Sequence, residues 1–154
     1  HLTATLAVDY ASVSEKAGFP VDCKPTAVGL AYPVITNKAA YQGTHNNLLN
    51  GYTDEEKAAL LKVTNLDEIV TSETAPSFIW TTATDQLVPA LNSLRFATAL
   101  AEQEVPYELH IYPSGGHGLS TGDEEVSPAC VEPRLKQWIA DCVAFFRTFT
   151  EEKF

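Results

Sequence analysis

Three short strand-like runs, separated by helical patterns, constrain the fold of this chain most. The runs cover residues 26–32 (TAVGLAY), 77–82 (SFIWTT) and 107–112 (YELHIY). The first is almost wholly apolar, which is typical of a strand covered on both faces of a parallel sheet. The other two are rich in aromatic and β-branched residues. Because helical patterns fall between the runs, their order predicts an α/β fold with a parallel sheet and flanking helices.

Local signals place a helix in each of the two intervals. Thr53 and Glu56 have the spacing of a capping box, in which each side chain bonds to the backbone N–H of the other residue. This helix fades before Asn65. In residues 91–101 leucine and alanine recur at helical spacing, and the helix must end before the Val-Pro pair because proline disfavours a helical residue ahead of it.

The remaining segments carry weaker signals. Residues 1–10 have the pattern of a helix without a start signal. Residues 11–25 are predicted as a loop, and residues 35–52 are polar and irregular. Pro133 suits the first turn of a last helix. A broad apolar stripe follows it through residues 135–149.

Charge and length exclude several classes of partner. The chain has 154 residues, 45% of them hydrophobic, which is enough for one buried core. Ten basic residues against 20 acidic ones give a net charge of −10. Such a surface repels phosphate backbones and anionic lipids, so neither nucleic acid nor a membrane is expected as a partner. No apolar stretch approaches the roughly 20 residues of a membrane helix.

The cysteines indicate a reducing compartment. Cys23, Cys130 and Cys142 are odd in number and widely spaced, and no C-x-x-C motif is present. This pattern argues against a zinc knuckle or a redox dithiol. We therefore expect three reduced, mostly buried thiols in a cytoplasmic protein.

Two loops that follow strands carry the candidate site. In a parallel α/β sheet, ligands bind at the carboxyl ends of the strands. The loop after residues 77–82 contains Asp85, and the loop after residues 107–112 contains His117 in a glycine-rich turn. A carboxylate that orients a histidine is the acid–base half of a catalytic triad. The alternative is that Asp85 caps the following helix and that His117 is an exposed loop residue.

A family resemblance favours the catalytic interpretation. Residues 76–119 resemble the C-terminal part of an α/β-hydrolase of the esterase/lipase group, in its acetyl-xylan-esterase-like and dienelactone-hydrolase-like branches. The matching stretches are APSFIWTTATDQLVP, NSLRFATAL, VPYELHIY and GGHGL, and the earlier run AYPVI resembles the preceding core strand and its exit. The resemblance implies that Asp85 and His117 are the acid and base of a Ser-His-Asp carboxylic-ester hydrolase. It also implies a small ester substrate and no cofactor.

The first four residues, HLTA, resemble the end of the family's nucleophile elbow, G-x-S-A-G-G-H-L. On this resemblance we expect the nucleophilic serine to lie upstream of His1. Residues 1–154 are then the C-terminal part of an α/β-hydrolase fold, a single partial domain that is inactive alone. A three-stranded sheet has a bare inner edge, so the missing N-terminal half of the domain, or a second copy of the chain, is expected as a partner.

Other candidate residues have weaker support. Ser120 fits G-x-S-x-G by letter, but the motif needs a strand directly before the serine and a helix directly after it. His1, His45 and His110 show no ligand spacing such as H-E-x-x-H, so no metal site is predicted. Two further interpretations stay open: a serine peptidase of the prolyl-oligopeptidase type, and a non-catalytic fragment or pseudoenzyme that acts as a binding or assembly module.

Overall fold

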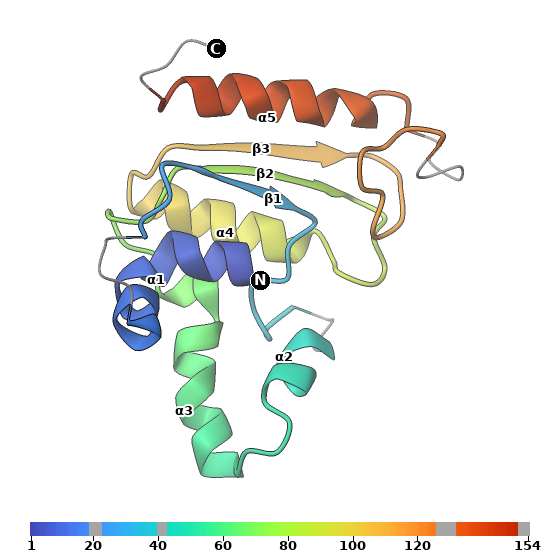
Figure 1. Cartoon of the computed structure of the whole chain (residues 1–154). Coiled ribbons are helices and arrows are strands. Elements are labelled where there is room, and N and C mark those ends of the chain that lie inside the picture. Colours follow the sequence, from blue (N-terminus) through green and yellow to red (C-terminus); the bar gives the residue numbers. More distant parts are fainter. Residues whose placement is uncertain (19–22, 40–42, 126–131, 151–154) are drawn as a thin grey trace.

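The computed structural model describes four stretches of the chain: residues 1–18, 23–39, 43–125 and 132–150. Its strands form one parallel sheet (Figure 1) in the order β1 (Val28–Ala31), β2 (Ser77–Thr82) and β3 (Tyr107–Tyr112). The two later strands occupy the predicted residues, and β1 is shorter at both ends than the predicted run 26–32. The predicted α/β fold with a parallel sheet and flanking helices is confirmed.

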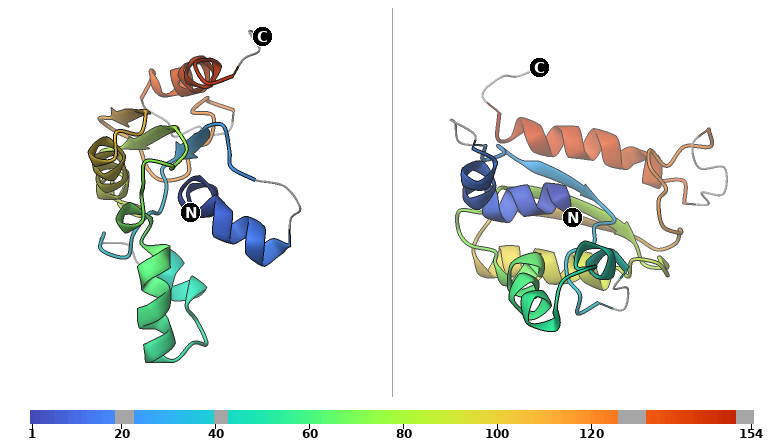
Figure 2. Two further views of the ribbon diagram at one scale, coloured as in Figure 1. Left: turned by 90° about the vertical axis from the view of Figure 1, so that its left-hand side faces the viewer. Right: turned by 60° about the horizontal axis from the view of Figure 1, so that its bottom comes forward.

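Helices cover both faces of this sheet. Figure 1 shows α1 (Leu2–Ala17) and α4 (Leu91–Glu102) on one face and α5 (Trp138–Arg147) on the other. The left view of Figure 2 shows the same layers edge-on. All six residues of β2 are buried, because this strand has a neighbour on each side and helices above and below.

The side chains of β2 alternate between two hydrophobic clusters, as the two-residue period of a strand requires. Ile79 packs with Ala7 of α1 and Phe96 of α4. Phe78 and Trp80 pack on the opposite face, against α5. The sheet is therefore the middle layer of a three-layer core, and its carboxyl edge is left to the loops.

Helix α1 is longer than the sequence predicts. The loop expected over residues 11–25 is wrong for its first part, because the helix continues to Ala17. Gly18 ends it in a left-handed conformation with φ of 68°, and its N–H bonds to the carbonyl of Glu15. The helix is kinked at Asp9, where φ is −137°. Residues 19–22 of the predicted loop lie outside the described residues.

Two helices leave the sheet and project beneath it (Figures 1 and 2), α2 (Gly43–Leu48) and α3 (Asp54–Thr64). The expectation of irregular structure over residues 35–52 is wrong at α2, which is too short to show a helical period in sequence. The capping box of α3 is confirmed. Thr53 Oγ1 accepts the N–H of Glu56 at 3.3 Å, and Glu56 Oε2 accepts the N–H of Thr53 at 2.8 Å.

Buried asparagines fix the chain where it leaves β1 for these helices. Asn92 Oδ1, at the start of α4, accepts the backbone N–H groups of Ile35 at 2.9 Å and of Thr36 at 3.2 Å. Asn65 Oδ1, at the end of α3, accepts the N–H of Asn37 at 2.9 Å and the hydroxyl of Thr36 at 3.3 Å. These amide oxygens take the place of the strand hydrogen bonds that residues 35–37 lack.

The last helix begins later than expected. Pro133 does not lie in its first turn, because a 3₁₀ turn over Leu135–Gln137 comes between Pro133 and α5. Leu135 is fully buried and packs on Gly122, where a Cβ atom would lie 2.8 Å from the leucine side chain. This contact between Leu135 and Gly122 fixes the path of the backbone before α5 begins.

Candidate active site

The loops that leave β2 and β3 are joined at the carboxyl edge of the sheet. Thr82 and Thr84 both donate their hydroxyls to the carbonyl of Gly115 at 2.8 Å, and the Gly115 N–H donates to Thr84 Oγ1 at 2.9 Å. Gly115 has φ of 141°, and a Cβ atom there would lie 2.7 Å from the Thr82 side chain. Only glycine fits this close crossing without strain.

The joined loops bring Asp85 and His117 together. Asp85 Oδ2 lies 2.8 Å from His117 Nδ1. Asp85 Oδ1 accepts the backbone N–H groups of Leu87 and Val88, each at 2.9 Å. The Asp85 side chain is fully buried, while the His117 side chain keeps 29% of its surface exposed. The predicted proximity of this carboxylate and this imidazole is confirmed.

The alternative role for Asp85, as the cap of the following helix, is wrong. The N-cap of α4 is Ala90, and no side chain caps that helix. The N–H groups of Leu87 and Val88 instead donate to one oxygen of Asp85 in a tight turn that points its second oxygen at His117.

The hydrogen bonds define which ring nitrogen of His117 is free. An ionised carboxylate only accepts, so Nδ1 carries the hydrogen toward Asp85 and Nε2 keeps its lone pair in the neutral ring. Among the described residues Nε2 has no hydrogen-bond partner. This arrangement can take a proton at Nε2 while the buried carboxylate holds the ring in place.

Tyr32 is a neighbour of His117 to which the sequence analysis gave no role. It follows β1, and its ring meets the imidazole edge-on, with centroids 4.8 Å apart and planes at 69°. Its hydroxyl accepts the N–H of Ser120 at 3.3 Å, and its φ is 39°. The available signal was its position at the end of the first predicted strand, on the sheet edge where the loops of Asp85 and His117 meet.

The other candidate side chains lie apart from this pair or have structural partners. Ser120 lies in a turn with neither a strand before it nor a helix after it, and its carbonyl accepts the indole N–H of Trp138 at 3.0 Å. His110 bonds to Glu108 at 2.6 Å on the edge strand, and His1 bonds to the carbonyl of Val34 at 3.1 Å. Within the four described stretches, no three His, Cys, Asp or Glu residues are grouped as metal ligands.

The cysteines and the helices add two observations. Cys23 and Cys142 are free thiols, and Cys130 lies outside the described residues. Burial and the negative charge of Glu108 raise the pKa of the Cys142 thiol. No helix in the described part of the chain has the length and apolar character needed to cross a membrane.

Comparisons with known proteins place this geometry in a family. The chain is 36% identical over 129 residues to endo-1,4-beta-xylanase B of Butyrivibrio fibrisolvens, a match that covers 81% of this chain and 20% of the xylanase. An acetyl ester-xyloside bifunctional hydrolase from Caldicellulosiruptor lactoaceticus superposes with a TM-score of 0.78 at 34% identity, over 96% of this chain and 52% of that protein. An alpha/beta hydrolase from a Medee basin deep-sea metagenome has a TM-score of 0.65 at 25% identity, over 97% and 50%.

The chain therefore spans about a fifth to a half of the length of the relatives it matches. Its sheet and flanking helices are those of an α/β hydrolase, as the sequence resemblance implied. The model of the prolyl oligopeptidase family matches residues 26–146, a stretch that includes all three strands together with Asp85 and His117. The chain belongs to the prolyl oligopeptidase family.

Proposed function

We propose that this chain supplies the acid–base half of a serine hydrolase that cleaves carboxylic esters. The observation that carries the proposal is the 2.8 Å contact between the buried carboxylate of Asp85 and Nδ1 of His117. The hydrolase names of the similar proteins support the same class of reaction.

In this mechanism His117 is the general base and Asp85 orients it. Nε2 of His117 takes the proton of a serine hydroxyl as the serine oxygen attacks the ester carbonyl carbon. The same proton then passes to the leaving alcohol, which gives an acyl-enzyme, and a water molecule activated by His117 releases the acid. Asp85 holds the Nδ1–H tautomer and stabilises the imidazolium that forms at each step.

The proposed nucleophile is a serine outside residues 1–154, on an elbow that precedes them. The chain covers 52% of the acetyl ester-xyloside hydrolase, so that relative has further residues in which a nucleophile can lie. Ser120 is a poor alternative, since no strand or helix flanks it. Without the nucleophile the chain alone is expected to be inactive, because the members of a triad act as a unit.

The proposed substrate is a small ester, with an acetylated xyloside as the first candidate. The support is the name of the 34% identical acetyl ester-xyloside hydrolase and that of the 36% identical xylanase. Family membership favours a second candidate, a prolyl peptide bond, since a serine peptidase could use the same acid–base pair.

The test uses the longer protein that carries this chain, with p-nitrophenyl acetate, an acetylated xyloside and a prolyl p-nitroanilide as substrates. His117→Ala is expected to lower kcat for the ester about 10⁴- to 10⁶-fold, and Asp85→Asn about 10⁴-fold. His110→Ala is the matched control, because it removes a half-buried histidine of β3 that bonds to Glu108 and not to Asp85. It should keep near wild-type activity.

Three results would contradict the proposal. Ester turnover that survives His117→Ala would exclude His117 as the base. Turnover by residues 1–154 alone that depends on His117 would place the nucleophile inside this chain. Cleavage of the prolyl p-nitroanilide without ester hydrolysis would favour the peptidase.

The bare edge of β1 supports a proposal about the partner. Within the described residues β1 pairs only with β2, so the N–H and C=O groups of its other edge have no strand partner. We propose that the N-terminal half of the same domain, or else a second copy of the chain, covers this edge. Light scattering of the chain alone and of the longer protein tests this proposal. We expect the chain alone to dimerise through the bare edge, and the longer protein to be a monomer because its N-terminal half covers that edge.

A cytoplasmic location stays a prediction, supported by the two free thiols in the described residues. Cell fractionation of the producing organism would test it, and recovery of the protein outside the cell would contradict it.

A further inference from the structure

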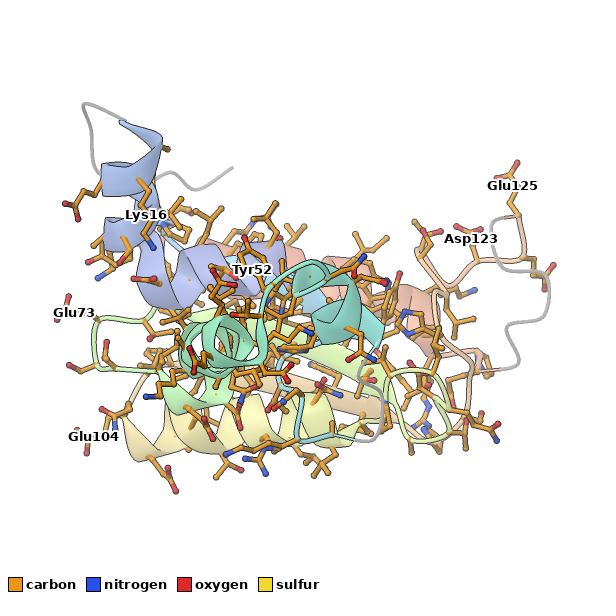
Figure 3. The ribbon with its side chains drawn as sticks, turned by 90° about the horizontal axis from the view of Figure 1, so that it is seen from below. Lys16, Tyr52, Glu73, Glu104, Asp123 and Glu125 are labelled. Carbon is orange, nitrogen blue, oxygen red and sulfur yellow. The ribbon has the colours of Figure 1, made fainter. Side chains whose placement is uncertain are left out.

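Tyr32 contacts both the hydrophobic core and His117 at the carboxyl edge of the sheet. Figure 3 shows the loops of this edge at the end of the molecule where Asp123 and Glu125 are labelled. The half-buried tyrosine ring meets the imidazole edge-on at 4.8 Å and meets the ring of Trp80 edge-on at 4.9 Å. Trp80 lies in β2 and is fully buried, so it gives the tyrosine ring a fixed support.

The contact with Tyr32 restricts a movement that the hydrogen bond to Asp85 leaves open. Asp85 Oδ2 holds Nδ1 of His117 at 2.8 Å, but a ring held by one hydrogen bond can still tilt about that contact. A tilt would move Nε2, the atom that takes the proton in the proposed reaction. The bonds within residues 82–117 therefore hold the pair together, and the tyrosine ring limits the remaining freedom of the imidazole.

The hydroxyl of Tyr32 also holds the loop that carries His117. It accepts the backbone N–H of Ser120 at 3.3 Å, and the carbonyl of Ser120 accepts the indole N–H of Trp138 at 3.0 Å. On the other side of His117 the loop is held through the carbonyl of Gly115. The loop is thus held on both sides of the imidazole, and Tyr32 contributes to the C-terminal side.

The backbone of Tyr32 is strained. Its φ is 39°, in the left-handed region, although the next residue is Pro33 and a residue before proline favours an extended conformation. Its N–H donates to the carbonyl of Trp80 at 2.7 Å, which fixes it to β2. Strained residues persist where the surrounding contacts determine them, and they are frequent at functional sites. The strain therefore points to a role for Tyr32 beyond filling the core.

We propose that Tyr32 is a positioning residue for His117: its ring keeps Nε2 directed at the nucleophile, and its hydroxyl steadies the loop. Tyr32 acts through the imidazole and not on the reacting atoms. This inference rests on the proposed function, because the direction of Nε2 matters for the rate only if His117 is the base.

Kinetics of the longer protein with p-nitrophenyl acetate test the effect on the rate. Tyr32→Leu removes the ring, so kcat should fall about 10- to 100-fold at unchanged KM, because a misplaced base weakens only the transition state. Tyr32→Phe keeps the ring and loses the bond to Ser120, so kcat should fall only about fivefold. Recovery of most of the activity by phenylalanine assigns the main effect to the ring.

Tyr112→Leu controls for packing. Tyr112 ends β3, is buried, and belongs to the same hydrophobic cluster as Trp80, with ring centroids 6.2 Å apart. In the described part of the chain its ring has no contact with that of His117. The variant loses a tyrosine ring from the same cluster, and its kcat should stay near that of the parent.

Nitrogen chemical shifts of the ¹⁵N-histidine-labelled chain test the position of the ring without catalysis. The chain has four histidines, and His117→Ala assigns the signals of one of them. In the parent the neutral His117 ring should show one tautomer, with its hydrogen on Nδ1. In Tyr32→Leu the two nitrogen shifts should move toward each other, because a tilted ring bonds less firmly to Asp85, and in Tyr112→Leu they should not move.

The outcomes separate this proposal from the proposed function. Unchanged kcat in Tyr32→Leu, with His117→Ala inactive, would overturn the role of Tyr32 alone. A raised KM at unchanged kcat would assign Tyr32 to substrate binding, and an equal loss in Tyr112→Leu would assign the effect to packing; either result overturns positioning. If His117→Ala stays active, the proposed function fails, and unmoved nitrogen shifts in Tyr32→Leu would overturn the present proposal as well. Should Tyr32→Leu fail to fold, unchanged kcat in Tyr32→Phe would overturn it.

Discussion

Asn92 provides the sharpest test of how the segment after β1 is held. Its side chain is almost fully buried, and its Oδ1 is the acceptor for the backbone N–H groups of Ile35 and Thr36, both of which are buried. Asn92→Leu keeps the branched shape of the side chain but removes the acceptor. Two amide groups then stay buried without a partner.

The expected loss can be worked from these contacts. Each buried N–H group left without an acceptor costs about 1–3 kcal/mol, and burial of two methyl groups in place of the amide offsets roughly 1–2 kcal/mol. With the middle of each range, the variant should therefore lose about 2.5 kcal/mol of unfolding free energy, which is a large part of the roughly 5–15 kcal/mol of a typical domain. With a urea m-value of about 1–3 kcal/mol/M, the midpoint should fall by on the order of 1–2 M.

Urea unfolding followed by the fluorescence of Trp80 and Trp138 measures this loss. Asn47→Leu, at an exposed position of α2, is the control and should stay within about 0.5 kcal/mol of the parent. Asn92→Asp keeps an acceptor near the amino end of α4, where negative charge is favoured, and should lose less than the leucine variant. If Asn92→Leu is no less stable than Asn47→Leu, the amide oxygen does not hold this segment.

Three further predictions concern other parts of the fold. Gly115→Ala should destabilise the chain by about 2–5 kcal/mol in urea unfolding, because the added methyl group meets two side chains at a residue with a positive φ. Gly116→Ala, whose methyl group faces open space, should be near neutral. Equal effects of the two variants would contradict the steric argument. Hydrogen bonds from the backbone N–H and the hydroxyl of Thr53 lower the pKa of Glu56, so the capping box stabilises the fold above the ordinary glutamate pKa and loses this contribution as pH falls through the lowered value. Thr53→Ala should therefore cost about 1 kcal/mol near neutral pH and less in acid. A loss of stability that does not depend on pH would contradict this linkage. Cys142, whose thiol pKa is raised by burial, should be alkylated by iodoacetamide only after unfolding, and rapid labelling of the native chain in peptide mass spectra would show that this face of α5 opens.

The sequence predicted the features that depend on local chemistry. The strands at 77–82 and 107–112 were identified from their aromatic and β-branched residues, and the start of α3 from its capping box. The contact between Asp85 and His117 followed from topology, because consecutive parallel strands place their exit loops on one edge. These predictions needed no knowledge of which side chains pack together.

The features that were missed depend on contacts between distant segments. Tyr32 became a neighbour of His117 only through the pairing of β1 with β2, and its positive φ has no signature in sequence. Helix α2 has six residues, too few for a period, and its folding buries His45. The sequence analysis ended α1 too early because glycine and proline usually indicate a loop. In the structure the helix extends through Ala17, and Gly18 is its cap.

The acid–base pair is fixed by residues that lie close to it in the chain. Both oxygens of Asp85 are used within the two loops, one on backbone amides of its own turn and one on His117. The crossing of these loops is held by the hydroxyls of Thr82 and Thr84 on Gly115. None of these bonds needs a residue outside 82–117, so the geometry of the pair is already formed before substrate or a serine arrives. In the proposed reaction, such preorganisation lets the buried carboxylate orient the imidazole without rearrangement. That proposal then requires a nucleophile placed within reach of Nε2.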